Sequence, residues 1–161
     1  MFRRLAVVAA LSLPAAVIAA PTTSPTSYVA QAGASDLYEI TSSRLVMTSH
    51  NPQVRDFAQQ MVHDHTQSTA EVKAAAMRAH LHPAPPRMNA MQTRMISQLR
   101  RASGPARDRL YIQQQRQAHQ MALTLHRTFS QRGSAAPLRM TAAKITPVVQ
   151  SHLDMLRTMH G

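Results

Sequence analysis

Residues 51–80 read NPQVRDFAQQMVHDHTQSTAEVKAAAMRAH and carry the clearest helical signal of the chain. Asn51 offers a side-chain acceptor for a helix N-cap, and Pro52 brings the preset φ that suits the first helical position. The positions that follow at steps of three, four and seven predict a helix to about His80 with one buried face. That face consists of Val54, Ala58, Met61, His65, Val72, Ala76 and Ala79.

A second helix is expected before this one, over about 27–49. Ser27 can cap it, because its hydroxyl can accept a hydrogen bond from the first turn. Its apolar residues at helical spacing are Leu37, Ile40 and Met47, which predicts that these three face the core.

Prolines separate this first pair of helices from the rest of the chain. Segment 82–86 (HPAPP) ends the preceding helix, since proline lacks an N–H donor and keeps the residue before it out of α geometry. After this segment we expect three helices, a short one over 87–102, a long one over 104–132 and a last one over about 137–160. Pro147 lies inside the last of these helices and should bend it.

The short helix carries a methionine stripe. Met88, Met91, Met95 and Leu99 share one face at steps of three and four, which is typical of flexible core filler. A copper site of thioether ligands is the alternative interpretation of the same methionines.

This order of elements predicts the topology. Four long helices, with a short helix between the second and third, require a long crossover, so we expect an all-α, ferritin-like four-helix bundle with a short extra helix in the crossover between helices two and three. The composition agrees, because 4% aromatic residues and 4 glycines in 161 residues disfavour a sandwich or barrel. The lack of cysteine excludes disulfides, thiolate zinc sites and iron–sulfur clusters.

The N-terminus is typical of an exported protein. Arg3 and Arg4 precede an apolar run that Pro14 interrupts, and this run is shorter than the roughly 20 residues that a membrane helix needs. We expect a signal peptide over 1–19, a disordered leader over 20–26 and the bundle over 27–161. The protein would then be periplasmic or secreted, with no transmembrane segment after processing.

The net charge of +11 is concentrated in the C-terminal half, where residues 87–161 hold twelve basic and two acidic side chains. Such a surface attracts anionic envelope polymers or lipid headgroups. No aromatic residues interleave the arginines, so we expect no nucleic acid partner. A merely solvated basic surface is the alternative. The arginines of this candidate surface are Arg87, Arg94, Arg100, Arg101, Arg107 and Arg109.

One metal-competent residue of each long helix falls at a similar height. With a rise of 1.5 Å per residue, these residues lie roughly 14 to 23 Å from the helix ends in the expected topology. Imidazoles with one carboxylate suit Zn, Fe, Ni or Cu(II), so the layer is a candidate site for one such ion. The candidate ligands are Glu39, His65, His119 and His152.

Three neighbours, Asp36, Tyr111 and Gln115, are expected to hydrogen bond to these ligands. The rival interpretation is a structural core in which the polar groups satisfy one another, because the chain has no close ligand pair at metal-ligand spacing. Asp64 is expected on another face of its helix as a surface acceptor, and His126 could extend the layer.

Two enzyme classes fit poorly. A di-iron oxidase needs Glu-x-x-His pairs, and the only glutamates, Glu39 and Glu71, are not followed by histidine at that spacing. A hydrolase needs a nucleophile elbow or a glycine-rich loop, and neither motif occurs, so no catalytic residue is assigned.

Four sequence words, SDLYEITSSRL, DFAQQMVHDHT, RDRLYIQQQRQAHQMAL and TPVVQSHLDML, resemble a family of exported bacterial domains of unknown function. The resemblance covers about 28–160 and implies a ferritin-like fold and export, but no activity. The family is often labelled a predicted outer membrane protein, although the chain has no second apolar span or lipidation cysteine. Gln115 and Arg116 depart from the family pattern. The residues that match it are Glu39, Asp64, His65, Tyr111, His119, Pro147 and His152.

The sequence therefore favours a binding or envelope-stress module over an enzyme. The first hypothesis is an exported bundle that holds one Zn, Fe, Cu or Ni ion in its core. The alternative is a basic interaction module that docks on anionic envelope polymers or lipid. A ferritin-type redox enzyme fits less well.

Overall fold

The computed structural model describes residues 23–160, and over this range the chain forms five α-helices and no strand. The predicted all-helical bundle is confirmed. The expected signal peptide and the first residues of the expected leader, 20–22, lie outside the described residues. The helices are α1 (Pro25–Arg44), α2 (Pro52–Arg78), α3 (Ala90–Arg101), α4 (Gly104–Arg132) and α5 (Ala136–Thr158).

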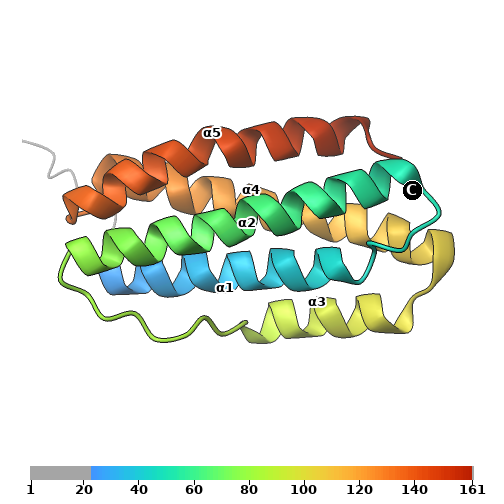
Figure 1. Ribbon diagram of the computed structural model, residues 1–161, viewed down its shortest axis with the longest axis horizontal. Helices are drawn as coiled ribbons and strands as arrows, with labels where there is room; N and C mark the ends of the chain where they lie inside the picture. Colours follow the sequence, from blue (N-terminus) through green and yellow to red (C-terminus); the bar gives the residue numbers. More distant parts are fainter. Residues whose placement is uncertain (1–22, 161) are drawn as a thin grey trace, which may run out of the picture.

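The four long helices lie side by side, with α1 and α5 running in one direction and α2 and α4 in the other (Figure 1). The pairs α1–α2 and α4–α5 pack along one another, and α2 also contacts α5 while α1 contacts α4. Between α2 and α4, an extended segment and α3 carry the chain back along the bundle, and α3 packs on α1 and α4. The expected long crossover with a short helix in it is therefore present.

Local chemistry explains the ends of α2. The Asn51 side chain accepts a hydrogen bond from the Gln53 N–H at 3.0 Å, and Pro52 begins the helix, as predicted. At the other end His80 adopts a positive φ of 57°, and the Leu81 N–H donates to the Ala76 carbonyl at 2.9 Å. This turn ends α2, and the chain continues from it into the crossover segment.

Two helices begin elsewhere than expected. The cap of α1 is Ser24, whose hydroxyl accepts from the Ser27 N–H at 3.2 Å, so the last residues of the expected leader are helical. The cap of α3 is Asn89, which exchanges hydrogen bonds with Gln92 in a capping box and starts the helix three residues after the predicted position.

The predicted inner stripe of α1 is wrong. Met47 lies after the helix and is 37% exposed, and Leu37 and Ile40 are only partly buried. The buried side of α1 carries polar groups, so apolar spacing alone selects the wrong face. Its buried members are Tyr28, Ala32, Gly33, Ala34, Asp36, Tyr38, Glu39, Ser42 and Ser43.

The core has two apolar clusters. The first apolar cluster lies toward the α1–α2 turn and includes Tyr38, Val54, Phe57, Met61, Leu99, Tyr111 and Leu156. The second apolar cluster lies toward the opposite end and includes Tyr28, Ala32, Val72, Ala122, Phe129, Leu138 and Val149. In α3, Met95 and Leu99 are buried in the first cluster while Met88 and Met91 pack against it, which agrees with core filler.

Between the two clusters lies a buried polar layer. Along α2, α4 and α5 its residues come after the members of one cluster and before those of the other. Burial of the large apolar side chains on both sides, at about 1.5–3 kcal/mol each, stabilises the bundle and fixes the layer at mid-height. The polar layer consists of Asp36, Glu39, His65, Ser68, Gln115, His119 and His152.

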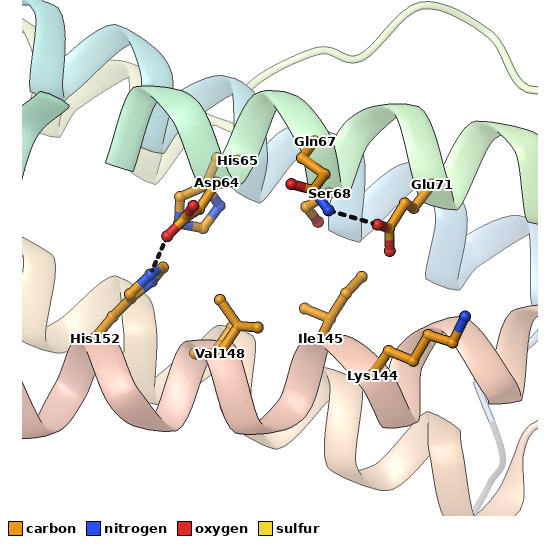
Figure 2. A pocket seen from close by; sticks show the side chains of 10 residues that line it. Asp64, His65, Gln67, Ser68, Glu71, Lys144, Ile145, Val148 and His152 are labelled. Atoms are coloured by element: carbon orange, nitrogen blue, oxygen red, sulfur yellow. Dashed lines mark hydrogen bonds and ion pairs between the residues drawn. The ribbon is translucent and has the colours of Figure 1, made fainter. Parts of the chain in front are cut away.

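A cavity of about 220 Å³ between α2 and α5 reaches this layer. Figure 2 shows His65 and His152 at one end of the cavity and Glu71 and Lys144 at the other. The layer is thus buried but accessible from one side. Within 23–160, none of the helices is apolar over a length that would cross a bilayer.

Candidate metal centre

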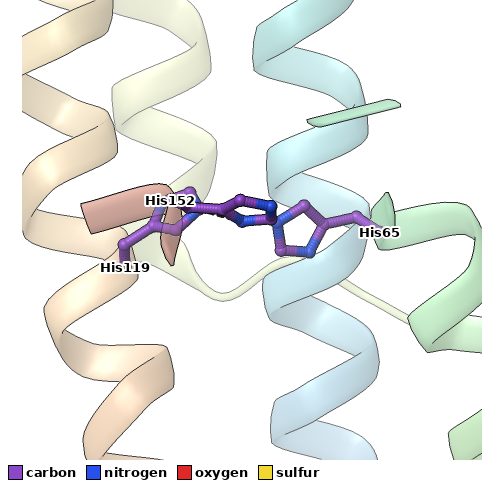
Figure 3. A group of neighbouring side chains, drawn as sticks. All are labelled: His65, His119 and His152. Atoms are coloured by element: carbon purple, nitrogen blue, oxygen red, sulfur yellow. Dashed lines mark hydrogen bonds between the residues drawn. The ribbon is translucent and has the colours of Figure 1, made fainter. Parts of the chain in front are cut away.

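Three imidazole rings from three different helices meet in the polar layer. His65 comes from α2, His119 from α4 and His152 from α5, and all three are at most 4% exposed. Their ring centroids lie 5.3, 5.5 and 5.6 Å apart. One nitrogen of each ring lies within 4.8 Å of the others (Figure 3). We call these residues the histidine triad.

The open nitrogen of His65 is Nε2. Its Nδ1 lies 2.8 Å from Asp36 Oδ1, and because a carboxylate only accepts, Nδ1 donates. In the neutral ring Nε2 then carries the lone pair, and this buried atom has no hydrogen-bond partner among the described residues. Burial opposes the charged ring, but the hydrogen bond and charge of Asp36 outweigh it and raise the pKa of His65.

The open nitrogen of His119 is also Nε2. Its Nδ1 donates to the Gln115 carbonyl at 3.0 Å, which leaves the lone pair on Nε2. Burial, and then the neighbouring rings of His65 and His152, hold the pKa of His119 well below its usual range. The ring is therefore neutral at physiological pH.

In His152 the open nitrogen is Nδ1. Its Nε2 donates to Asp64 Oδ2 at 2.9 Å, so the lone pair of the neutral ring lies on Nδ1. Burial lowers the pKa of His152. Although burial opposes the charge of Asp64 too, hydrogen bonds from His63 and His152 hold the pKa of this carboxylate below its usual value.

The triad therefore brings lone pairs together. His119 Nε2 and His152 Nδ1 lie 3.2 Å apart, yet with the donors just described both are acceptors. Two acceptors at that distance require a proton or a cation between them. Two nitrogens bound to one tetrahedral ion at 2.0–2.1 Å would lie roughly 3.3 Å apart. The spacing of this pair therefore suits an ion, while the group of three nitrogens, with His65 included, spans up to 4.8 Å.

Glu39, the expected carboxylate ligand, lies on the other side of His119. Its Oε1 is 3.6 Å from Nδ1 of His119, the nitrogen that faces the Gln115 carbonyl. Both carboxylate oxygens are buried without a hydrogen-bond partner in residues 23–160. Burial raises the pKa of Glu39 to about 7. The structure thus places Glu39 next to the triad but outside the group of converging nitrogens.

Of the three residues expected to hydrogen bond to the ligands, two do so and one does not. Asp36 and the carbonyl of Gln115 each accept from a triad histidine, whereas the Tyr111 hydroxyl pairs with Ser43 Oγ at 2.8 Å, in the first apolar cluster. The expectation for Asp64 is wrong, since it reaches across to His152 instead of serving only as a surface acceptor. Its place beside His65 in the sequence does not show that α5 packs against that face of α2.

His126 does not extend the layer. Its Nδ1 and the Tyr28 hydroxyl share a hydrogen bond of 3.0 Å, and Tyr28 stacks on Phe129 in the second apolar cluster. Burial lowers the pKa of His126 to about 4. This ring is a buried histidine satisfied by a single local partner.

One of the six arginines of the candidate surface, Arg107, has a structural role instead. Arg107 is partly buried, and it donates to the carbonyls of Ala102 at 2.6 Å and Leu45 at 3.1 Å, so it joins two chain segments. The other five arginines are exposed: Arg87, Arg94, Arg100, Arg101 and Arg109.

Comparison with known proteins places the chain near one family and several solved folds. A family model described as "Domain of unknown function (DUF4142)" matches residues 10–159. No curated protein matches the chain.

The similar solved structures include two forms of CopM. The Cu(II)-bound form has a TM-score of 0.70 and 14% identity and covers 85% of this chain and 95% of that chain. The Cu(I)-bound form has a TM-score of 0.69 and 16% identity and covers 83% and 93%. A DUF305 protein from Streptomyces coelicolor has a TM-score of 0.67 and 11% identity and covers 83% and 90%. At these identities the likeness is one of fold.

Proposed function

The chain belongs to the family described as domain of unknown function DUF4142, and we propose that this member binds one transition-metal ion through His65, His119 and His152. The observation that carries the proposal is the convergence of three imidazole nitrogens, two of them 3.2 Å apart, in a buried layer. Three imidazoles suit Zn, Fe, Ni or Cu, and an ion would displace the proton that the raised pKa of His65 favours.

The groups behind the ligands support the proposal. Each triad histidine donates its other N–H to an acceptor, namely Asp36, the Gln115 carbonyl or Asp64. Such partners fix the ring and its tautomer, and they are typical of metal-binding histidines. A buried divalent ion also needs nearby negative charge, which the carboxylates of Asp36 and Asp64 supply and Glu39 would add to when ionised.

Copper is the first ion to test. CopM, which this chain resembles in fold, is described in Cu(II)-bound and Cu(I)-bound forms. Imidazole nitrogens bind copper as well as zinc, nickel and iron, so the donor set is compatible with that choice.

The rival occupant is a shared proton. A proton between His119 Nε2 and His152 Nδ1 would join these two rings but leave His65 Nε2 without a partner, whereas an ion engages all three. This difference makes the two proposals separable by measuring bound metal.

The test uses protein purified without a histidine tag and stripped with a chelator. After addition of Cu(II), Zn(II), Ni(II) or Fe(II) and removal of free ion by gel filtration, we expect about one equivalent of at least one metal. His65→Ala and His152→Ala should each abolish its retention, while His82→Ala, at an exposed position outside the polar layer, should not. Retention of no ion, or equal retention by His152→Ala, would refute the proposal.

Export and the finer fold class belong to the same proposal. We propose cleavage after residue 19, a periplasmic or secreted location, a ferritin-like bundle and a role in envelope stress. N-terminal sequencing of the protein recovered from the envelope fraction should begin at Ala20, and an intact Met1 would contradict the cleavage.

A second candidate function rests on the exposed arginines. Arg87, Arg94, Arg100, Arg101 and Arg109 make no salt bridge to any residue of the described chain. Their charge could dock the protein on anionic envelope polymers or lipid headgroups. Binding to anionic vesicles should then weaken steeply with added salt and in Arg94→Gln/Arg101→Gln, while Arg127→Gln, at an exposed position outside this set, serves as the control.

A further inference from the structure

The cavity between α2 and α5 ends on two of the three triad histidines. His65 and His152 line it, together with Ser68, Val148 and Lys144, and it has a volume of about 220 Å³ (Figure 2). His119 does not line it, so the cavity approaches the triad from the α2–α5 side. A ligand in the cavity would meet an ion at the triad from that side.

Two buried polar atoms in the cavity lining lack partners within the described chain. One is the Ser68 hydroxyl and the other is Nε2 of His65. Ser68 is 8% exposed and His65 is 4% exposed. Buried polar groups are nearly always hydrogen-bonded, so this pair points to a guest in the cavity that they contact.

An ion at the triad would give His65 Nε2 a partner, but the Ser68 hydroxyl would still lack one. Three protein ligands leave a tetrahedral ion one position for an exogenous ligand. We propose that a small inorganic anion enters through this cavity, takes that position and accepts a hydrogen bond from Ser68 Oγ. This inference rests on the proposed metal-binding function.

Size and charge select the class of ligand. Pockets for drug-sized molecules measure about 300–1,000 Å³, so a cavity of about 220 Å³ suits a ligand of a few atoms. Lys144 is exposed at the far end of the cavity and makes no ion pair with any described residue. The two carboxylates in the lining accept hydrogen bonds, Asp64 from His63 and His152 and Glu71 from Gln67, but they keep their charge. The attraction for an anion therefore comes from the ion at the triad, and Lys144 adds one positive charge at the far end of the cavity.

The test titrates the Cu(II)-loaded full-length protein with azide and follows the azide-to-copper charge-transfer band. We expect a saturable band with one azide per copper. Val148→Trp should abolish the band at azide concentrations that saturate the unmodified protein, because the indole fills the cavity. Ser68→Ala should weaken azide binding by roughly tenfold, the effect of one lost hydrogen bond.

Met140→Trp is the matched control, because Met140 lies on α5, is 66% exposed and does not line the cavity. Its azide titration should match that of the unmodified protein. Val148 is itself 43% exposed, so a tryptophan there is compatible with folding, and copper bound per chain reports whether the triad is intact.

The outcomes separate this inference from the metal proposal. Copper retention without an azide band, an unchanged band in Val148→Trp, or loss of copper to azide overturns the cavity ligand and leaves the metal site standing. Failure to bind copper or any other tested ion overturns both.

Discussion

Two buried histidines on α4, one heptad apart, behave differently. His126 shares a hydrogen bond with the Tyr28 hydroxyl inside the second apolar cluster, whereas Nε2 of His119 in the polar layer directs its lone pair at the lone pair of His152 Nδ1. Both are at most 2% exposed. Burial therefore does not distinguish a structural histidine from a candidate metal ligand. The hydrogen-bond partner of each ring nitrogen does distinguish them.

The largest expected contrast concerns stabilisation by metal. An ion that binds only the folded protein, at 1,000 times its dissociation constant, stabilises it by about 4 kcal/mol. We expect this gain in the unmodified protein and in His126→Gln, and its loss in His119→Ala. Urea unfolding with metal and with excess chelator measures it, and a retained gain in His119→Ala would erase the distinction between the two histidines.

The next contrast concerns pH. Burial lowers the pKa of His126 to about 4 from its usual 6.5, so between these values the unfolded chain binds the additional proton. The free energy of unfolding should therefore fall as the pH drops from about 6.5 to 4, by about 3 kcal/mol at most.

His126→Gln keeps a hydrogen-bonding group for Tyr28 but cannot titrate. The difference between its unfolding free energy and that of the unmodified protein, measured by urea titration in chelator across this pH range, isolates the contribution of His126. A difference that does not change with pH would show that the ring is not held neutral.

A smaller effect is expected from the groups behind the triad. Asp64→Asn removes the charge that orients His152, and such changes weaken metal binding by about 10–100-fold. Competition with a chromophoric chelator measures the affinity. Asp154→Asn, at an exposed position on α5, is the control and should leave the affinity unchanged.

The smallest expected effect concerns the partner of His126. Tyr28→Phe removes the hydroxyl that hydrogen bonds with Nδ1 of His126 and should lower the free energy of unfolding by about 1 kcal/mol. Metal affinity should not change, because this pair lies outside the triad. A change in affinity comparable to that of Asp64→Asn would indicate that the two histidine environments are coupled.

Much of the fold was predictable because its signals are local. Asn51-Pro52 marks the start of α2, and Gly104 and Arg132 bound α4 as predicted. The inner face of α1 was not predictable from apolar spacing, because Asp36 and Glu39 occupy it. Those carboxylates are buried by their position beside histidines that arrive from other helices.

The site was predictable in height but not in orientation. The rise per residue brings His65, His119 and His152 to one layer, which is where the structure has them. It does not determine which way each ring turns, so Glu39 faces the back of His119 and Asp64, expected elsewhere, reaches His152. Such contacts depend on helix rotation and on the α2–α5 packing.

The origin of the triad in three separate helices has a mechanical consequence. His119 and His152 are 33 residues apart in the chain, so an ion held between them would act as a cross-link that closes this loop, and its binding to His65 would tie α2 to both. A cross-link of this kind restricts the opened states more than the closed one. Amide hydrogen exchange in the middle of α5 would then slow on loading, while the ends of the bundle would continue to fray.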